Sequence, residues 1–206
     1  MVYYAEKSTQ KDSWATDTDL NVLRQGLLDL FCQLAYQEGD FILSSGARST
    51  YYINGKQVTL HPQGALAIGR LLFNMLSPNT KAVAGLTLGA DPIVSAVSLV
   101  SAIEDRPIPA LIVRKEAKGH GTKAYIEGPS LSEGSEVIVL EDVVTTGQSA
   151  MKAVTRLRDA GYTVNQVISL IDRQQGGAEY YKSVNLQFEA VFSITDIQER
   201  YKQIAD

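Results

Sequence analysis

The chain has 206 residues, a length that suits one domain able to bury roughly 70% of its unfolded surface without a metal or a disulfide. Hydrophobic residues make up 45% and charged residues 20%, which is ordinary for a globular protein, and the formal net charge is −4. An acidic chain has no global positive field to attract nucleic acid or an anionic membrane, so we expect neither as a partner.

Two further properties of the sequence concern its compartment. The single cysteine, Cys32, excludes an intrachain disulfide and lies in an apolar stretch typical of a buried helix. No apolar run approaches the ~20 residues that span a bilayer, and residues 1–14 lack the apolar core of a secretory signal. We therefore expect a cytoplasmic protein.

The first 60 residues predict an arm followed by a small helix and a hairpin. Residues 1–16 are polar and show no periodicity, so we interpret them as a flexible N-terminal arm. Acidic and hydroxyl residues before Leu20 offer N-caps for a helix that runs to about Gln37, which Gly39 can end. Apolar residues on either side of a Gly-containing turn predict a hairpin at 41–53.

After residue 60, short apolar strands alternate with helical patterns. The strands are expected at residues 82–86, 110–113, 137–140, 167–171 and 188–192. The helices are expected at residues 62–76, 91–100 and 149–160 and at the C-terminus, where Thr195 and Gln198 form a capping box. This order predicts an α/β fold with a central, mainly parallel sheet flanked by helices. We expect residues 17–206 to form a single domain, in which about 17–60 supply a small N-terminal hood.

The stretch from Val137 to Ser149 carries the clearest functional pattern. An apolar strand ends on Glu141 and Asp142, and small hydroxyl residues and Gly147 then lead into a helix. Gly147 allows the backbone to approach an anion, and N–H groups at a helix start point towards it. The acids repel phosphate but suit sugar hydroxyls or the water around Mg²⁺. The pattern indicates a site for a phosphorylated sugar; solvated acids before a capped helix are the alternative.

This segment closely resembles the signature of the type I phosphoribosyltransferases, which implies that family's fold and phosphoribosyl pyrophosphate (PRPP) as a substrate. The resemblance implies Mg²⁺ as cofactor, held mainly through PRPP and water, with no metal ligand directly from the protein. It also makes Asp142 an expected catalytic group. The PRPP-binding residues expected in this segment are Glu141, Asp142, Val143, Val144, Thr145, Thr146, Gly147, Gln148 and Ser149.

Residues 114–121, which we call the basic segment, concentrate four potentially cationic groups between apolar stretches. Two glycines and the lack of periodicity predict a mobile loop, although a run of charge is more commonly a solvated surface. The basic segment begins where the strand at 110–113 ends, at the same expected sheet edge as Glu141. Cations there would stabilise the negative charge that develops on departing pyrophosphate. We expect Lys118 and His120 to be catalytic, and Arg114, Lys115, Lys118 and His120 to bind PRPP.

The sequence Arg-Lys-Glu-Ala-Lys-Gly-His-Gly of the basic segment resembles the catalytic loop of the orotate phosphoribosyltransferases. Residues 41–52 resemble that family's N-terminal hairpin, residues 168–177 resemble its strand-end arginine motif, and the whole resemblance covers about residues 20–195. It implies transfer of the 5-phosphoribosyl group from PRPP to orotate in de novo UMP synthesis. It also implies a homodimer in which the basic segment acts across the interface.

The same resemblance implies the residues that select the base. Arg173 would pair with the orotate carboxylate, as a guanidinium fork suits a planar carboxylate, and Thr145 would also face orotate. Ser44 and Gly89 stand where many members have lysine, so we assign neither a role, although residues 85–92 could still reach pyrophosphate through backbone N–H groups. Two alternatives stay open: a phosphoribosyltransferase for another base, which would have no carboxylate for Arg173, and a non-enzymatic PRPP-binding regulator.

Overall fold

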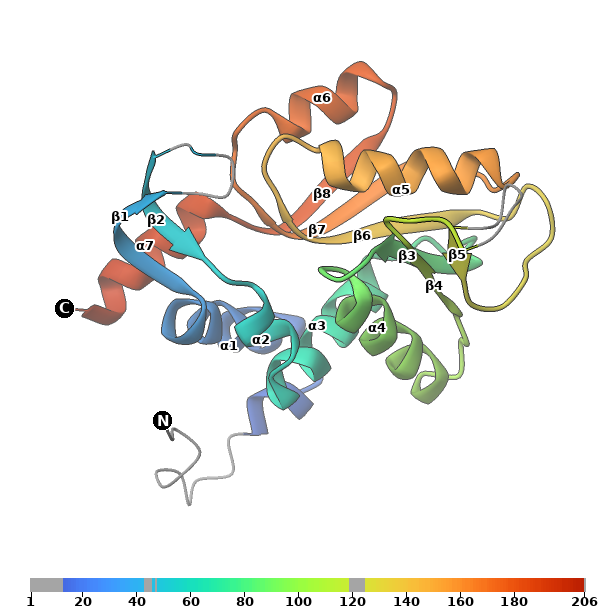
Figure 1. The fold of residues 1–206 in the computed structure, drawn as a ribbon. Helices are drawn as coiled ribbons and strands as arrows, with labels where there is room; N and C mark the ends of the chain where they lie inside the picture. Colours follow the sequence, from blue (N-terminus) through green and yellow to red (C-terminus); the bar gives the residue numbers. More distant parts are fainter. Residues whose placement is uncertain (1–12, 43–45, 47, 119–124, 206) are drawn as a thin grey trace.

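A computed structural model describes residues 13–42, 46, 48–118 and 125–205 (Figure 1). Within these ranges the main sheet has six strands in the order β5-β4-β3-β6-β7-β8. β5 pairs antiparallel with β4, and all other neighbours pair parallel. The α/β class and the mainly parallel sheet are therefore confirmed. The strands are β3 (Ala82–Leu86), β4 (Ala110–Val113), β5 (Ile126–Glu127), β6 (Val137–Val144), β7 (Gln166–Asp172) and β8 (Gln187–Ser193).

Helices cover both faces of this sheet, which explains why its strands are apolar throughout. Ile138 and Leu140 of β6 pack in one apolar cluster, whereas Val137 and Val139 pack in a second cluster on the other face. The first cluster includes α1 (Leu20–Leu34), α3 (Pro62–Met75), α4 (Asp91–Ile103) and α7 (Ile194–Ala205), and the second includes α5 (Gln148–Asp159) and α6 (Gly177–Ser183) (Figure 1). None of the helices in the described part of the chain has the length and apolar character needed to cross a bilayer.

The hood consists of α1, the antiparallel hairpin of β1 (Tyr36–Ile42) and β2 (Arg48–Ile53), and the short α2 (Lys56–Thr59). Asp19 caps α1 by accepting a hydrogen bond from the Asn21 N–H at 2.8 Å. The prediction that this helix reaches Gln37 and ends at Gly39 is wrong. Tyr36 already pairs with Ile53 in the hairpin, so from this residue on the backbone is part of a β-strand and cannot continue the helix.

Residues 13–16 belong to the arm in the sequence prediction, but they form a packed 3-10 helix, η1 (Ser13–Thr16). Trp14 lies directly against Gly26 of α1, where a side chain would collide with the indole ring, and Ala15 is buried. These residues are therefore part of the domain, because apolar contacts hold them on α1 and α3. Residues 1–12 lie outside the described part of the chain.

Two predicted boundaries near the site also change. β6 does not end at Leu140 but continues to Val144, because Glu141 and Val144 still pair with Ser169 and Asp172 of β7.

The capping box of α7 lies at Ser193 and Asp196 rather than at Thr195 and Gln198. The Ser193 N–H donates to the Asp196 carboxylate at 2.8 Å, and the Asp196 N–H donates to the Ser193 hydroxyl at 3.1 Å. The sequence patterns also gave no warning of η1, α2, β5 or α6.

Candidate functional site

The carboxyl ends of the parallel strands meet at one edge of the sheet, where open α/β folds bind their ligands. The segments that follow β3, β4, β6 and β7 all emerge there. The Arg156 guanidinium of α5 donates hydrogen bonds to the carbonyl groups of Arg114 and Lys115, at 2.9 Å for Lys115. The start of the basic segment therefore lies against the last turn of α5, the helix that follows β6.

The turn between β6 and α5, residues 145–149, forms what we call the phosphate loop. Gly147 caps α5 with φ +82°, a left-handed conformation that favours glycine. A Cβ atom at this position would lie 2.9 Å from Cζ of Tyr181. The loop surrounds a small pocket at the amino end of a 12-residue helix, where N–H groups favour an anion. The pocket is lined by Glu141, Val143, Val144, Thr145, Thr146, Gly147, Gln148, Ser149, Ala150 and Tyr181.

Helix α6 supports the phosphate loop from behind. Gly177 approaches Val144 so closely that a side chain would collide with the valine. The buried Tyr181 hydroxyl donates to the Gly147 carbonyl oxygen at 3.1 Å and so holds the turn in place. Sequence reasoning missed Tyr181 as a site residue. The Gly176-Gly177 pair, in which Gly176 caps α6 in a left-handed conformation, was the available signal.

The acid Glu141 lies inside the site but away from solvent, with 6% of its surface exposed. Burial raises the pKa of the Glu141 carboxyl well above its ordinary range, and the negative charge of Asp142 raises it further, while Lys115 opposes the shift. Among the described residues, Oε2 of Glu141 has no hydrogen-bond partner. A buried acceptor without a partner suits a ligand hydroxyl group.

The second acid, Asp142, faces the segment that follows β3. Its Oδ1 accepts a hydrogen bond from the Val143 N–H at 2.9 Å. A Cβ atom on Gly89 would lie 2.8 Å from the same oxygen, so the backbone at Gly89 passes directly over the carboxylate. The peptide bond between Thr87 and Leu88 in this segment is cis. The structure thus places Gly89 beside Asp142.

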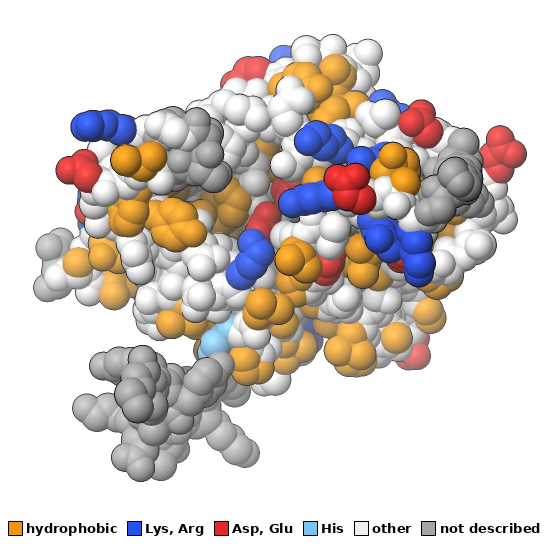
Figure 2. All heavy atoms as spheres, viewed as in Figure 1, with side chains coloured by type: hydrophobic (Ala, Val, Ile, Leu, Met, Phe, Trp, Pro, Cys, Tyr) orange, Lys and Arg blue, Asp and Glu red, His pale blue; other side chains and the backbone are white. Residues whose placement is uncertain are grey.

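Two cations in the described part of the basic segment, Arg114 and Lys118, lie near one carboxylate. Nη1 of Arg114 lies 3.0 Å from Oε1 of Glu127, and Nζ of Lys118 lies 3.9 Å from the same oxygen. The Lys118 side chain is 72% exposed. Basic side chains gather on this face over β4, β5 and α5 (Figure 2). His120 lies outside the described residues.

Arg173 stands immediately after β7, next to the phosphate loop. Its backbone N–H donates to the Val144 carbonyl oxygen at 2.9 Å, so Arg173 and Thr145 leave adjacent strands at the same level. Its Nε donates to the Tyr51 hydroxyl at 3.0 Å, and its guanidinium lies 4.9 Å from the centre of the Tyr51 ring. The structure therefore brings together the two predicted base-binding residues and adds Tyr51, which sequence reasoning missed.

Two acidic side chains of the site, Glu141 and Asp142, could contribute oxygen ligands to a metal ion. No group of three His, Cys, Asp or Glu side chains that could hold an ion occurs within the described ranges. Glu141 and Asp142 offer the oxygen ligands that Mg²⁺ prefers, and one of these oxygens lacks a protein partner. The two residues therefore fit a metal ion that brings most of its ligands with it.

A parallel sheet of this order, with a phosphate loop after an acidic central strand, is the architecture of the type I phosphoribosyltransferases. The family model that matches the chain has the description "Uracil phosphoribosyltransferase" and covers residues 94–198. This range contains the phosphate loop and the basic segment but leaves out the hairpin and Tyr51, so it describes the shared phosphoribosyl site better than the base site.

Comparison of the full chain narrows the family. An orotate phosphoribosyltransferase from Nostoc sp. is 71% identical over 206 residues, which is 100% of both chains. Two crystal structures of the Mycobacterium tuberculosis orotate phosphoribosyltransferase, one with Fe(III) dicitrate and one with PRPP, are 38% and 34% identical with TM-scores of 0.75 and 0.71. Each comparison covers 85% of this chain and, respectively, 98% and 99% of the other. The chain belongs to the orotate phosphoribosyltransferase family.

Proposed function

We propose that the protein transfers the 5-phosphoribosyl group from PRPP to orotate, giving orotidine 5′-phosphate and pyrophosphate in UMP synthesis. The observation that carries this proposal is the backbone hydrogen bond between Arg173 and Val144, which sets beside the phosphate loop a residue whose guanidinium would pair with a carboxylate. The Mycobacterium tuberculosis relative has been solved with PRPP bound, which supports the donor.

The phosphate loop supplies neutral donors for the 5′-phosphate. Thr145, Thr146 and Ser149 line the pocket at the start of α5, where their hydroxyl groups and the N–H groups of the helix would bind the phosphate. Gly147 has a left-handed conformation, so the turn would receive the phosphate with little rearrangement. The 5′-phosphate would therefore fix the sugar before reaction.

Glu141 and Asp142 would hold the ribose hydroxyl groups. When the C1–oxygen bond breaks, positive charge develops on the ribose, and nearby carboxylates stabilise that charge. Mg²⁺, arriving with PRPP, would supply charge neutralisation on the pyrophosphate, with Glu141 and Asp142 available to its water ligands. A cationic ligand would also favour the ionised form of Glu141, whose pKa burial raises.

The cations of the basic segment would act on the leaving group. Lys115 lies close enough to Glu141 to oppose the rise in the pKa of that carboxyl, and Arg114 precedes it in the chain. Lys118 and His120 would close over pyrophosphate as its charge grows. Arg173 would orient the orotate carboxylate so that N1 faces the ribose, with Thr145 beside it. Holding both reactants in this way makes a bimolecular reaction effectively unimolecular.

We further propose a homodimer in which the basic segment acts across the interface. An apolar groove between α3 and α4 supports the assembly, because Leu60 and Leu99 line it and are each about two-thirds exposed. A surface of this kind commonly marks a protein interface. Sedimentation at micromolar concentration tests the assembly. We also propose that the protein works in the cytoplasm.

The direct test is consumption of orotate, followed by its ultraviolet absorbance, with PRPP and Mg²⁺ present or omitted one at a time. The proposal predicts consumption only when all three are present, with one pyrophosphate released for each orotate. A PRPP-binding regulator would release none. Because the matching family model is named for uracil, a second candidate function is transfer to uracil, and pyrophosphate release with uracil but not with orotate would favour it.

A further inference from the structure

Tyr51 contacts Arg173 with both its hydroxyl group and its ring. The Tyr51 oxygen accepts a hydrogen bond from Nε at 3.0 Å, and the guanidinium lies 4.9 Å from the ring centre. Tyr51 is almost fully buried at 9% exposure, so it has little freedom to leave this contact. The pair joins β2 of the hood to the end of β7 across 122 positions of sequence.

This contact determines which edge of the guanidinium is available. Among the described residues, neither Nη group of Arg173 has a hydrogen-bond or ion-pair partner, whereas Nε is occupied. An arginine can bind a carboxylate in two bidentate ways. It donates either from both Nη groups, or from Nε and one Nη group. Because Tyr51 occupies Nε, the edge that carries the two Nη groups is the one left for a ligand.

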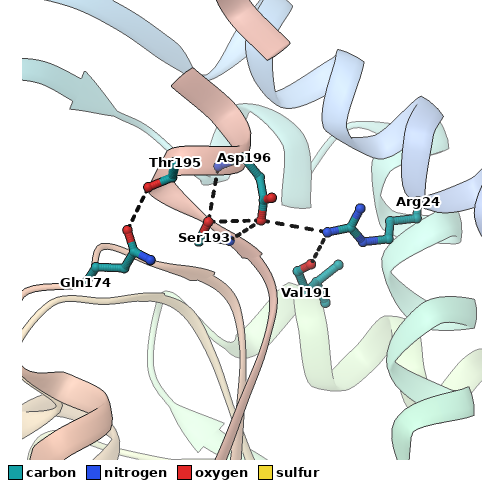
Figure 3. A network of polar contacts seen from close by, with 6 residues as sticks. All are labelled: Arg24, Gln174, Val191, Ser193, Thr195 and Asp196. Carbon is teal, nitrogen blue, oxygen red and sulfur yellow. Dashed lines mark hydrogen bonds and ion pairs between the residues drawn. The ribbon is translucent and has the colours of Figure 1, made fainter. Parts of the chain in front are cut away.

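The backbone around Arg173 is fixed separately. The Gln174 N–H donates to the Asp172 carboxylate at 2.8 Å, and the Arg173 N–H is held by Val144. The Thr195 hydroxyl, at the start of α7, donates to the Gln174 side-chain oxygen at 2.8 Å (Figure 3). The freedom that remains is rotation of the Arg173 side chain, and Tyr51 restricts it.

Tyr51 is itself held by an aromatic column that leads away from the site. Its ring stacks on Tyr36 of β1 at 5.9 Å, and the Tyr36 ring meets Tyr201 of α7 edge-on at 4.9 Å. The Tyr36 hydroxyl lies 3.1 Å from Glu38 and does not contact Arg173. The column therefore offers a second tyrosine hydroxyl, one ring away, that serves as a control.

We infer that Tyr51 is a positioning residue for base selection: its hydroxyl holds Nε of Arg173 so that the two Nη groups face the carboxylate of the acceptor. The inference rests on the proposed function, in which Arg173 receives orotate. It adds that the hood supplies part of the selectivity, through a side chain that acts on Arg173.

The test compares Tyr51→Phe with Tyr36→Phe, because each change removes one hydroxyl and keeps its ring in the column. Steady-state rates give the KM for orotate and for PRPP, and inhibition by uracil reports binding of a pyrimidine without a carboxylate. Tyr51→Phe should raise the KM for orotate roughly three- to tenfold, the effect of one lost hydrogen bond, while the KM for PRPP and the uracil inhibition constant stay unchanged. Tyr36→Phe should match the wild type in all three.

Two results would overturn the inference while leaving the proposed function intact. One is an active wild type with no change in the orotate KM of Tyr51→Phe, and the other is an equal loss of orotate and uracil binding, which would indicate general loosening of the site. A wild-type enzyme that does not consume orotate would instead overturn the proposed function, and the inference with it. Thermal unfolding of both variants checks that each is folded.

Discussion

The phosphate loop and the basic segment face the same sheet edge, but they are built in opposite ways. The phosphate loop is packed from behind by Gly177 and Tyr181, and its central glycine has a left-handed conformation. The described part of the basic segment is exposed, and its cations Arg114 and Lys118 share one surface carboxylate, Glu127. Exposed ion pairs of this kind contribute little stability, so these cations are easily redirected.

Under the proposed function, the phosphate loop would mainly bind the donor and the basic segment would mainly act in catalysis. A group that carries the same charge throughout the reaction, the 5′-phosphate, can be met by a preformed site. A group whose charge grows as the bond breaks, pyrophosphate, is best met by cations that arrive with it, because only interactions stronger in the transition state accelerate the reaction. Substitutions in the two regions should therefore change different kinetic constants.

The largest expected effect is that of Lys118→Ala. Losing a cation that acts on the leaving group should lower kcat roughly a hundred- to a thousandfold, while PRPP binding weakens only a few-fold. Steady-state kinetics and direct titration with PRPP separate the two quantities. Lys202→Ala, an exposed lysine on α7, is the control and should behave as the wild type. Equal losses in turnover and binding would assign Lys118 to ground-state binding instead.

Gly147→Ala should act mainly on the donor site. The new Cβ would lie 2.9 Å from Tyr181 on a backbone with φ +82°, so the loop must shift, and a displacement near 1 Å lowers kcat/KM for PRPP by about a hundredfold. Gly134→Ala is a matched control, since Gly134 has φ +76° but no atom within 4 Å of its added Cβ. It should cost about 1 kcal/mol of unfolding free energy and leave kinetics unchanged. Similar kinetic losses in both variants would contradict a preformed phosphate loop.

The smallest expected effect concerns Glu141 and pH. Because burial and Asp142 raise the pKa of Glu141, the folded state binds its proton more tightly than the unfolded state does. The resulting stabilisation is present at acidic pH and is lost as the pH rises from the ordinary carboxyl range through the raised pKa. Glu141→Gln has no such proton, so its Tm should fall less than that of the wild type as the pH rises above the ordinary carboxyl range. Thermal unfolding measures this, with the exposed Glu104→Gln as control. Parallel curves for Glu141→Gln and the wild type would contradict the raised pKa.

The sequence predicted the parallel sheet well because each strand is buried on both faces, so that the local pattern and the tertiary environment agree. It failed at Tyr36 and Gln37, where the helical pattern of α1 continues but pairing with β2 takes over the backbone. It failed again at Thr195, whose hydroxyl bonds to Gln174 instead of capping α7. In both places a partner distant in the sequence decides the local structure.

The candidate site shows the same limit. Glu141, Asp142 and Gly147 follow one another along the chain, so a single stretch of sequence was enough to indicate them. Tyr51 and Tyr181 reach the site from other elements, through contacts with Arg173 and Gly147 that no local pattern encodes. The sequence therefore indicated the residues that are expected to contact the substrate, but not Tyr51 and Tyr181, which hold other site residues in place.

The most direct test of the account is a competition between orotate and uracil in one reaction with PRPP and Mg²⁺, with the two nucleotide products separated and quantified. The account predicts that orotidine 5′-phosphate forms almost alone, and that Arg173→Gln removes most of this preference by lowering the rate with orotate. Formation of uridine 5′-phosphate as the main product of the wild type would contradict it.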